Sequence, residues 1–263
     1  QNNLSMLHER FYMARERAAE ATPDWEKMRD QARLIKAHTM DNLDFYLEMV
    51  ERNVLKLGGN VFFATDADAA NRYIVDLAQR RNVRKVIKSK SMISEEMGLN
   101  SKLTSSGIST IETDLGEYII QLRGEAPYHI IAPAIHLSKS EVAATLHEKA
   151  NIPYYDSIED LVGAARVKLR KEFIDADMGI TGANFVVADT GSLVLVTNEG
   201  NGRMCTSMPR IHVAIMGMEK IIPSIEDLGI FLRLLIRSAT GQRITSYVTT
   251  INGPRSQQEI DGP

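Results

Sequence analysis

The spacing of apolar residues changes along the chain. From Thr39 to Leu57 apolar side chains recur at helical spacing, and Gly58-Gly59 ends this pattern. We therefore expect residues 1–57 to form a polar, helical N-terminal extension, either a cover packed on the core or an arm that docks a partner. After Gly59, short apolar runs alternate with amphipathic stretches, which is typical of a parallel sheet with helices on its faces.

The alternating part predicts a series of strands and helices. The expected strands are Asn60–Ala64, Val83–Ile87, Ser109–Glu112, His129–Ala132, Ile211–Met216 and Ile244–Ile251, and the expected helices are 66–81, 94–103, 115–122, 138–150, 157–173 and 224–239. Two further β-rich runs, Phe185–Ala188 and Leu193–Thr197, flank the turn sequence Asp189-Thr190-Gly191-Ser192 and predict a hairpin. The fold class is thus α/β with a mixed, mainly parallel sheet.

The chain of 263 residues divides into three segments. We expect the helical extension at 1–57, one α/β domain at 58–252, and a linker at 253–263, where Gly, Pro and Gln predominate. The linker is expected to lead to a further region of a longer protein.

Composition and charge exclude several classes of function. The net charge is −3, and acidic neighbours dilute the basic stretch from Arg80 to Lys90, so a nucleic-acid partner is not expected. No apolar run approaches the roughly 20 residues that span a bilayer. The single cysteine, Cys205, excludes an internal disulfide framework and an all-cysteine metal site, and it favours a reducing, cytoplasmic compartment.

Candidate site residues follow the predicted strands, because ligands of open α/β sheets bind beyond the carboxyl ends of the strands. Lys88-Ser89-Lys90-Ser91 suits an anionic group, with a solvated turn as the alternative. Glu112 ends a strand and is a candidate acid–base group, whereas Asp114 and Glu117 are expected to stabilise the next helix N-terminus. We interpret His129 and His136 as structural.

A second group of candidates surrounds the hairpin. Gly179–Asn184 and the turn Asp189–Ser192 offer glycines and backbone amides, which are typical either of tight turns or of an anion site. In Asn198–Arg203, Glu199 is a candidate base and Arg203 a planar donor for a carboxylate or phosphate. Cys205 is not expected to be a nucleophile, because that role needs a base and a lowered pKa.

These interpretations define one candidate site, with Lys88 and Glu112 expected as neighbours of the hairpin turn and of the loop that contains Glu199 and Arg203. We expect catalytic roles for Glu112 and Glu199, and no metal ligands. The expected anion-binding residues are Lys88, Ser89, Ser91, Thr181, Asn184, Asp189, Thr190, Gly191, Ser192, Gly200, Asn201, Arg203 and His212.

Five motifs in order make the chain resemble the LUD domains of lactate-utilization proteins. They are Glu112–Ile119, Gly179–Asn184, Ala188–Ser192, Asn198–Arg203 and Pro209–His212, and Thr249–Arg255 resembles the iron–sulfur branch of this family in particular. The resemblance implies a fold like that of the NagB/RpiA/CoA-transferase group. It also implies a role in oxidising L-lactate to pyruvate within a three-protein system, whose other two proteins are then partners.

Members of that branch carry ferredoxin-type [4Fe–4S] motifs after the LUD domain. With one cysteine, this chain holds no such cluster, so the clusters are expected only in a longer parent protein. Two other classes of function stay open: a non-catalytic scaffold that docks the redox partners, and a stand-alone enzyme of the CoA-transferase or cyclo-ligase kind. The sequence leaves open the ligand, the electron acceptor and whether the chain forms a homo-oligomer.

Overall fold

The computed structural model describes residues 2–128 and 132–255. The chain forms two compact units, which are described separately. Unit 1 comprises the described residues up to Phe63, Ala183–Glu199 and those from Met216 onward, and unit 2 comprises Ala64–Gly182 and Gly200–Ile215. The predicted α/β class with N-terminal helices is confirmed, but the strands form two four-stranded sheets where the sequence predicted one mixed sheet.

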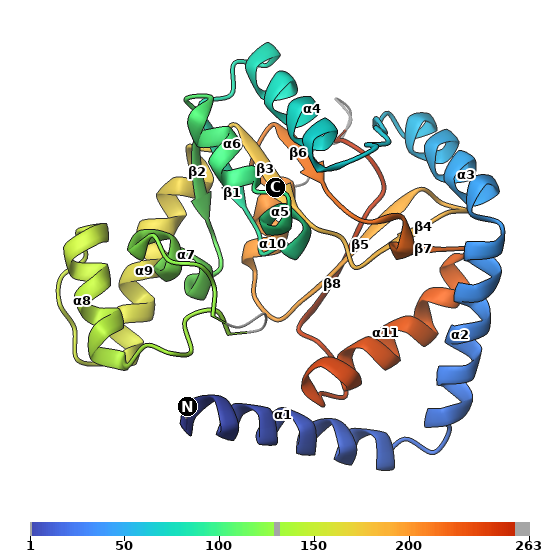
Figure 1. Ribbon diagram of the computed structural model, residues 1–263, viewed down its shortest axis with the longest axis horizontal. Coiled ribbons are helices and arrows are strands. Elements are labelled where there is room, and N and C mark those ends of the chain that lie inside the picture. Colours follow the sequence, from blue (N-terminus) through green and yellow to red (C-terminus); the bar gives the residue numbers. More distant parts are fainter. Residues whose placement is uncertain (1, 129–131, 256–263) are drawn as a thin grey trace. The chain divides into compact units, whose positions relative to one another are not determined.

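Unit 2 is built on a parallel sheet with strand order β2-β1-β3-β6 (Figure 1). Each of the pairs β1–β2, β1–β3 and β3–β6 is parallel, so the carboxyl ends of all four strands lie at one edge. The strands are β1 (Lys85–Lys88), β2 (Ser109–Glu112), β3 (Met178–Thr181) and β6 (Ile211–Ala214). The helices are α4 (Ala67–Arg80), α5 (Met92–Glu96), α6 (Leu99–Ser105), α7 (Leu115–Arg123), α8 (Lys139–Ala150), α9 (Ile158–Ile174) and α10 (Asn201–Ser207).

Alternating side chains send the strands of unit 2 into two separate cores. Val86, Met178 and Ile180 pack with α4 and α6, whereas Ile87 packs with α7, α8 and α9. Successive residues of a strand point to opposite faces. We call the face covered by α4 and α6 face A, and the opposite face, which α10 also approaches, face B.

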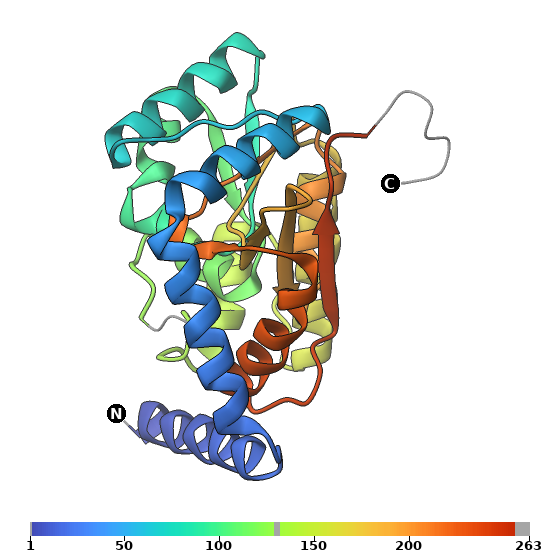
Figure 2. The same ribbon diagram turned by 90° about the vertical axis from the view of Figure 1, so that its right-hand side faces the viewer.

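Unit 1 has a smaller, mixed sheet with strand order β7-β4-β5-β8. The central hairpin β4–β5 is antiparallel, as predicted, and β8 pairs antiparallel with β5. Helix α11 packs against α1 and α2 (Figure 2), while α2 and α3 contribute Ala32, Tyr46 and Val50 to the cores. The elements are α1 (Asn2–Glu20), α2 (Trp25–Asp41), α3 (Leu43–Lys56), β4 (Phe185–Val187), β5 (Ser192–Thr197), the 3-10 turn η1 (Met218–Lys220), β7 (Ile221–Ile222), α11 (Ile225–Thr240) and β8 (Tyr247–Ile251).

Helix starts agree well with the sequence, because local side chains supply the caps. The helix predicted from residue 138 starts with a capping box, in which the Ser138 hydroxyl accepts from the amide of Glu141 while the Glu141 carboxylate accepts from the amide of Ser138. Ser157 and Ser224 cap α9 and α11 in the same serine-to-N3 manner.

Several predicted elements were wrong. Asn60–Ala64 forms no strand, and its Phe62 and Phe63 are 48% and 46% exposed, since an apolar run alone does not supply a pairing partner. The helix expected at 94–103 is divided by Gly98, whose φ of 65° ends α5. Residues 129–131 of the expected strand His129–Ala132 lie outside the described residues.

Candidate functional site

A buried ion pair lies at the carboxyl edge of the unit 2 sheet. Lys88 ends β1 and Glu112 ends β2, and the parallel register places these two residues opposite each other on face A. The Lys88 Nζ donates to Glu112 Oε1 at 2.6 Å, and the two side chains are only 1% and 5% exposed. Asn100 of α6 donates its Nδ2 to the same carboxylate oxygen at 2.7 Å. Burial of a charged pair is costly, so this pair is a strong candidate for function.

The lysines at this edge offer more N–H donors than the surrounding side chains accept. An ammonium has three donors, and among the described residues Lys88 Nζ has one side-chain acceptor, Glu112. Lys90 Nζ is buried with no hydrogen-bond partner in the described structure, although it lies 3.4 Å from Glu117 Oε1 as an ion pair. Such a surplus of buried donors suits a ligand with acceptor oxygens.

Two further carboxyl groups complete this cluster. Glu95 of α5 and Glu117 of α7 interact electrostatically, and two neighbouring buried carboxyl groups resist being ionised together. Burial, followed by the neighbouring carboxylate of Glu95, raises the pKa of Glu117 to about 7, and burial also raises the pKa of Glu95. The cluster therefore carries an exchangeable proton near neutral pH.

A second polar pair lies at the same edge but on face B. Thr181 Oγ1 at the end of β3 lies 2.8 Å from His212 Nε2 on β6. Burial lowers the pKa of His212 to about 4, so its imidazole is neutral at pH 7. Because 181 and 212 alternate with the face A residues 180 and 213, this pair points to the other side of the sheet from Lys88.

The remaining candidates in the Lys88–Ser91 loop are buried and tied to the backbone. The Ser89 amide donates to the carbonyl of Ile180 at 2.9 Å, which extends the sheet by one residue. Ser91 Oγ caps α5 by accepting from the amide of Ser94 at 3.4 Å. Their predicted role in anion binding therefore stays a prediction.

Gly179 and Cys205 turn out to be structural neighbours. A Cβ on Gly179 would lie 1.8 Å from the carbonyl oxygen of Cys205, so this glycine allows α10 to approach β3 closely. The sequence predicted a glycine loop for ligand approach here, but Gly179 and Thr181 are in strand β3. Burial raises the pKa of the Cys205 thiol to about 12, which agrees with the expectation that it is not a nucleophile.

The hairpin turn in unit 1 uses most of its amides internally. The amides of Asp189, Gly191 and Ser192 donate to Pro223 O, Val187 O and Thr190 Oγ1, respectively. Asn53 of α3 donates its Nδ2 to the carbonyls of residues 188 and 189. Asn184 Oδ1, another predicted ligand contact, accepts from the amide of Val196. These contacts account for the turn as a structural feature of unit 1.

The loop expected at Asn198–Arg203 is divided. Helix α10 begins at Asn201, so Arg203 lies exposed on a helix of unit 2, with Gly200 and Asn201 at the helix start. Glu199 is exposed and belongs to unit 1, as do Asn184 and the turn Asp189–Ser192. The structure thus brings together Lys88 and Glu112, and separately Thr181 and His212. The hairpin turn belongs to unit 1, whereas Lys88 and Arg203 belong to unit 2, so the single site expected around these three features stays a prediction.

Sequence reasoning did not single out four members of the buried cluster. Lys90 entered only as part of the loop that suits an anionic group and Glu117 only as a helix-start acid, while Glu95 and Asn100 were not considered. Asp114 does cap α7, as predicted, through the amides of residues 116 and 117. One signal was available for Glu117: the three residues that follow it, Tyr118-Ile119-Ile120, are all apolar, and in the structure all are buried, so this part of α7 is enclosed on more than one side.

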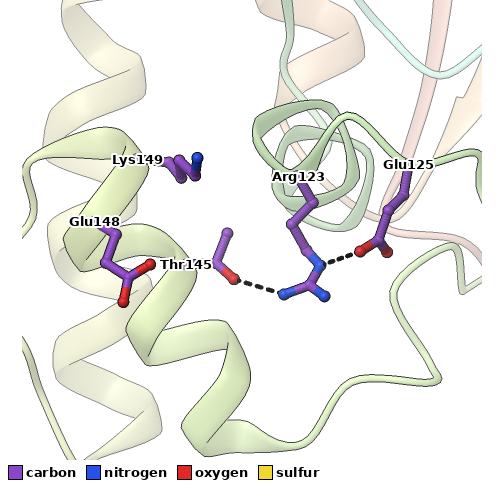
Figure 3. A pocket seen from close by; sticks show the side chains of 5 residues that line it. All are labelled: Arg123, Glu125, Thr145, Glu148 and Lys149. Atoms are coloured by element: carbon purple, nitrogen blue, oxygen red, sulfur yellow. Dashed lines mark hydrogen bonds and ion pairs between the residues drawn. The ribbon is translucent and has the colours of Figure 1, made fainter.

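A surface hollow of about 220 Å³ lies elsewhere in unit 2, at α7 and α8 (Figure 3). Its side chains include the exposed group Arg123 and Glu125, with Arg123 Nε donating to Glu125 at 2.6 Å and its Nη1 to Thr145 at 3.1 Å. His136 Nε2 lies 3.0 Å from Glu125 Oε2, consistent with the structural role expected of it. The hollow contains none of the predicted ligand residues.

The iron–sulfur clusters that the family resemblance implies do not fit this chain. A [4Fe–4S] cluster takes four cysteine thiolates, whereas the chain has one cysteine, which is buried. No step of the chemistry is therefore assigned to such a cluster here. None of the described helices is long and apolar enough to cross a membrane.

Comparison with known proteins identifies the family. The LUD domain model matches residues 47–262. The chain is 47% identical to lactate utilization protein B of Bacillus velezensis and 46% identical to that of Bacillus subtilis; each match covers 99% of this chain and 55% and 54% of the relative. It is also 46% identical to the "uncharacterized electron transport protein YkgF" of Escherichia coli over 95% of this chain and 52% of that protein.

The chain spans about half the length of the curated relatives it matches. No solved structure matches it. A domain match over most of the chain and high identity to several lactate-utilization proteins agree with the motif order seen in the sequence. The chain therefore belongs to the LUD domain family and is related to the lactate utilization B proteins.

Proposed function

We propose that this chain is the LUD part of a cytoplasmic lactate-utilization protein that helps to oxidise L-lactate to pyruvate. In this proposal it works with two partner subunits, and iron–sulfur clusters lie in a longer parent protein. The names of the relatives support a lactate-utilization role and electron transport. A single free cysteine fits a reducing compartment.

We further propose that the carboxyl edge of the unit 2 sheet binds a small anion. One observation carries this: the Lys88 ammonium is buried at the end of β1 beside Lys90, with more donors than acceptors. The side chain of Lys90 is 26% exposed whereas that of Lys88 is 1% exposed, so an anion reaches the edge most directly beside Lys90, whose ammonium itself is buried. Glu112 fixes the Lys88 ammonium through the 2.6 Å contact.

Ligand-induced stabilisation tests the anion site. L-lactate, pyruvate and sulfate are added singly, and the melting temperature is followed. An anion at about 100 times its Kd raises the free energy of unfolding by about 2.7 kcal/mol. We expect Lys90→Gln to abolish this stabilisation, because it removes the buried ammonium that lacks a hydrogen-bond partner.

A matched control is available on α6. Lys102 is 56% exposed, pairs loosely with Asp68 at 3.7 Å and lies outside the cluster, so Lys102→Gln should retain full stabilisation. Equal responses of Lys90→Gln and the unchanged chain would contradict the site. Arg203→Ala tests whether the anion binds at Arg203 on α10 and not beside Lys90. Loss of stabilisation in Arg203→Ala but not in Lys90→Gln would place the anion site at α10.

The role in lactate oxidation needs a different measurement. A three-subunit system is reconstituted with the full-length parent protein, and L-lactate-dependent reduction of a dye is followed. We expect Lys90→Gln in that protein to lower the rate and Lys102→Gln to leave it unchanged. An unaffected rate together with lost anion binding would favour a scaffold role for the LUD domain.

A further inference from the structure

The Glu95–Glu117 pair lies between two lysines at the carboxyl edge of the sheet. Glu117 is 5% exposed, and its carboxylate oxygen Oε1 is 3.4 Å from the buried Lys90 Nζ. Glu95 on α5 lies close enough to interact electrostatically with the same carboxyl group. Two neighbouring buried carboxyl groups resist double ionisation, so this pair is ready to take up one proton beside an ammonium that offers free N–H donors.

The charges that face this pair come from every neighbouring element. Lys88 on β1 and Lys90 in the following loop are positive, while Glu112 on β2 and Asp114 at the α7 cap are negative. Lys88 is held by Glu112, and Asp114 is engaged by two helix amides. Lys90 and the carboxyl pair are thus the groups at this edge that remain able to respond to an added charge.

We propose that anion binding at this edge is coupled to uptake of one proton by the Glu95–Glu117 pair. This rests on the anion site proposed above, and the ligand class is a small carboxylate or a sulfate-like anion. The anion takes the N–H donors of Lys90, and Glu117 thereby loses the attraction of that ammonium. The proton comes from solvent and bonds to the Glu117 carboxylate, while no bond of the ligand changes.

The expected pH dependence follows from thermodynamic linkage. Because the pKa of Glu117 is about 7, the pair is only partly protonated at neutral pH. An added negative charge favours the protonated form, so binding takes up a proton and becomes weaker as the pH rises above 7. The Kd should rise by up to about tenfold per pH unit between pH 7 and pH 8.5.

Calorimetry in two buffers with different ionisation heats measures the proton uptake directly. Sulfate, L-lactate and pyruvate serve as probes, because all are fully ionised over this range. We expect uptake of about half a proton or more at pH 7.5 for the unchanged chain. Glu117→Gln and Glu95→Gln should each abolish the uptake and flatten the pH dependence of the Kd.

The control is Glu172→Gln, which removes a unit 2 carboxylate that pairs with Lys85 at 2.7 Å outside the cluster. That variant should keep the full proton uptake. Binding without uptake in the unchanged chain overturns this inference and leaves the anion site intact. Failure of every probe to bind overturns the anion site and this inference with it.

A ligand-free measurement guards against variants that do not fold. The Glu117 carboxyl carbon is followed by NMR in the unmodified chain as the pH changes. We expect its titration midpoint near pH 7. A midpoint below about pH 5, close to an ordinary glutamate, would overturn proton uptake by this pair even if all variants failed to fold.

Discussion

The loop after β1 and the turn between β4 and β5 look alike in sequence but differ in structure. Both are short, polar and follow a buried strand. At the end of β1 and in its loop, the ammonium groups of Lys88 and Lys90 are buried and offer more N–H donors than the described side chains accept. In the hairpin turn, the amides of Asp189, Gly191 and Ser192 all donate within unit 1. The first region thus keeps buried N–H donors that no side chain of the described structure accepts, whereas the second uses its amides to hold the fold of unit 1.

The difference shows why polar composition alone is a weak sign of a site. A backbone amide in a turn is easily satisfied by a neighbouring carbonyl, and Asn53 adds two side-chain bonds to the same turn. A buried ammonium needs several acceptors, which few environments supply. Substitutions in the two regions should therefore have different consequences, and the following three run from the largest expected effect to the smallest.

The largest effect is expected at Lys88. Lys88→Met leaves Glu112 buried without its cation, and breaking a buried pair from one side costs about 3–5 kcal/mol of unfolding free energy. Urea denaturation measures the loss. The double variant Lys88→Met/Glu112→Leu removes both charges and should recover most of it. A double variant as unstable as the single one would show that the charged pair itself is not the cause.

A moderate effect is expected at Gly191 in the hairpin turn. This glycine has a φ of 71°, and a Cβ there would lie 2.9 Å from the backbone of Asn53. Gly191→Ala should therefore destabilise by about 1–3 kcal/mol through strain and crowding, without changing anion binding. In the control, Gly163→Ala in α9, the new methyl meets nothing within 4 Å and should stabilise by up to about 1 kcal/mol. Loss of anion binding in Gly191→Ala would show that the hairpin turn takes part in anion binding.

The smallest effect is expected at Asp189. Its exposed carboxylate accepts only a long 3.3 Å bond from the amide of Ile225, so Asp189→Ala should cost about 0.5–1 kcal/mol. Thermal denaturation and sulfate binding are measured on the same sample. Unchanged affinity is expected. A large drop in sulfate affinity in Asp189→Ala would show that the hairpin turn binds the anion as the β1 loop does.

The secondary structure was predictable where the signal was local. The helices predicted from residues 138, 157 and 224 and the Gly191 hairpin depend on residues three or four positions apart, and the structure has them as predicted, each helix capped by its serine. Strand β3 and helix α10 were not predicted. Strand β3 has Gly179 where α10 packs against it, because a side chain there would collide with the backbone of Cys205. These two residues are far apart in the sequence, so local patterns do not reveal the contact.

The candidate site was predictable in part. Lys88 and Glu112 were identified because they end strands, and the β1–β2 register then brings them together. Glu95, Asn100 and Glu117 come from three helices, and only packing shows that they face the same ion pair. The direction in which each strand residue points also affects the site. Thr181 and His212 point to face B, whereas Lys88 points to face A, so the two pairs lie on opposite sides of the sheet.

The sequence by itself determined the family, the α/β class, the helix caps and the strand-end positions of Lys88 and Glu112. These features depend on motif order, periodicity and short-range hydrogen bonds, all of which are written along the chain. The tertiary structure alone decided that the strands form two sheets, that Lys88 is buried and that burial raises the pKa of Glu117. The physical reason is that burial and charge coupling depend on side chains far apart in sequence, whose distances are fixed only when the helices pack on the sheet.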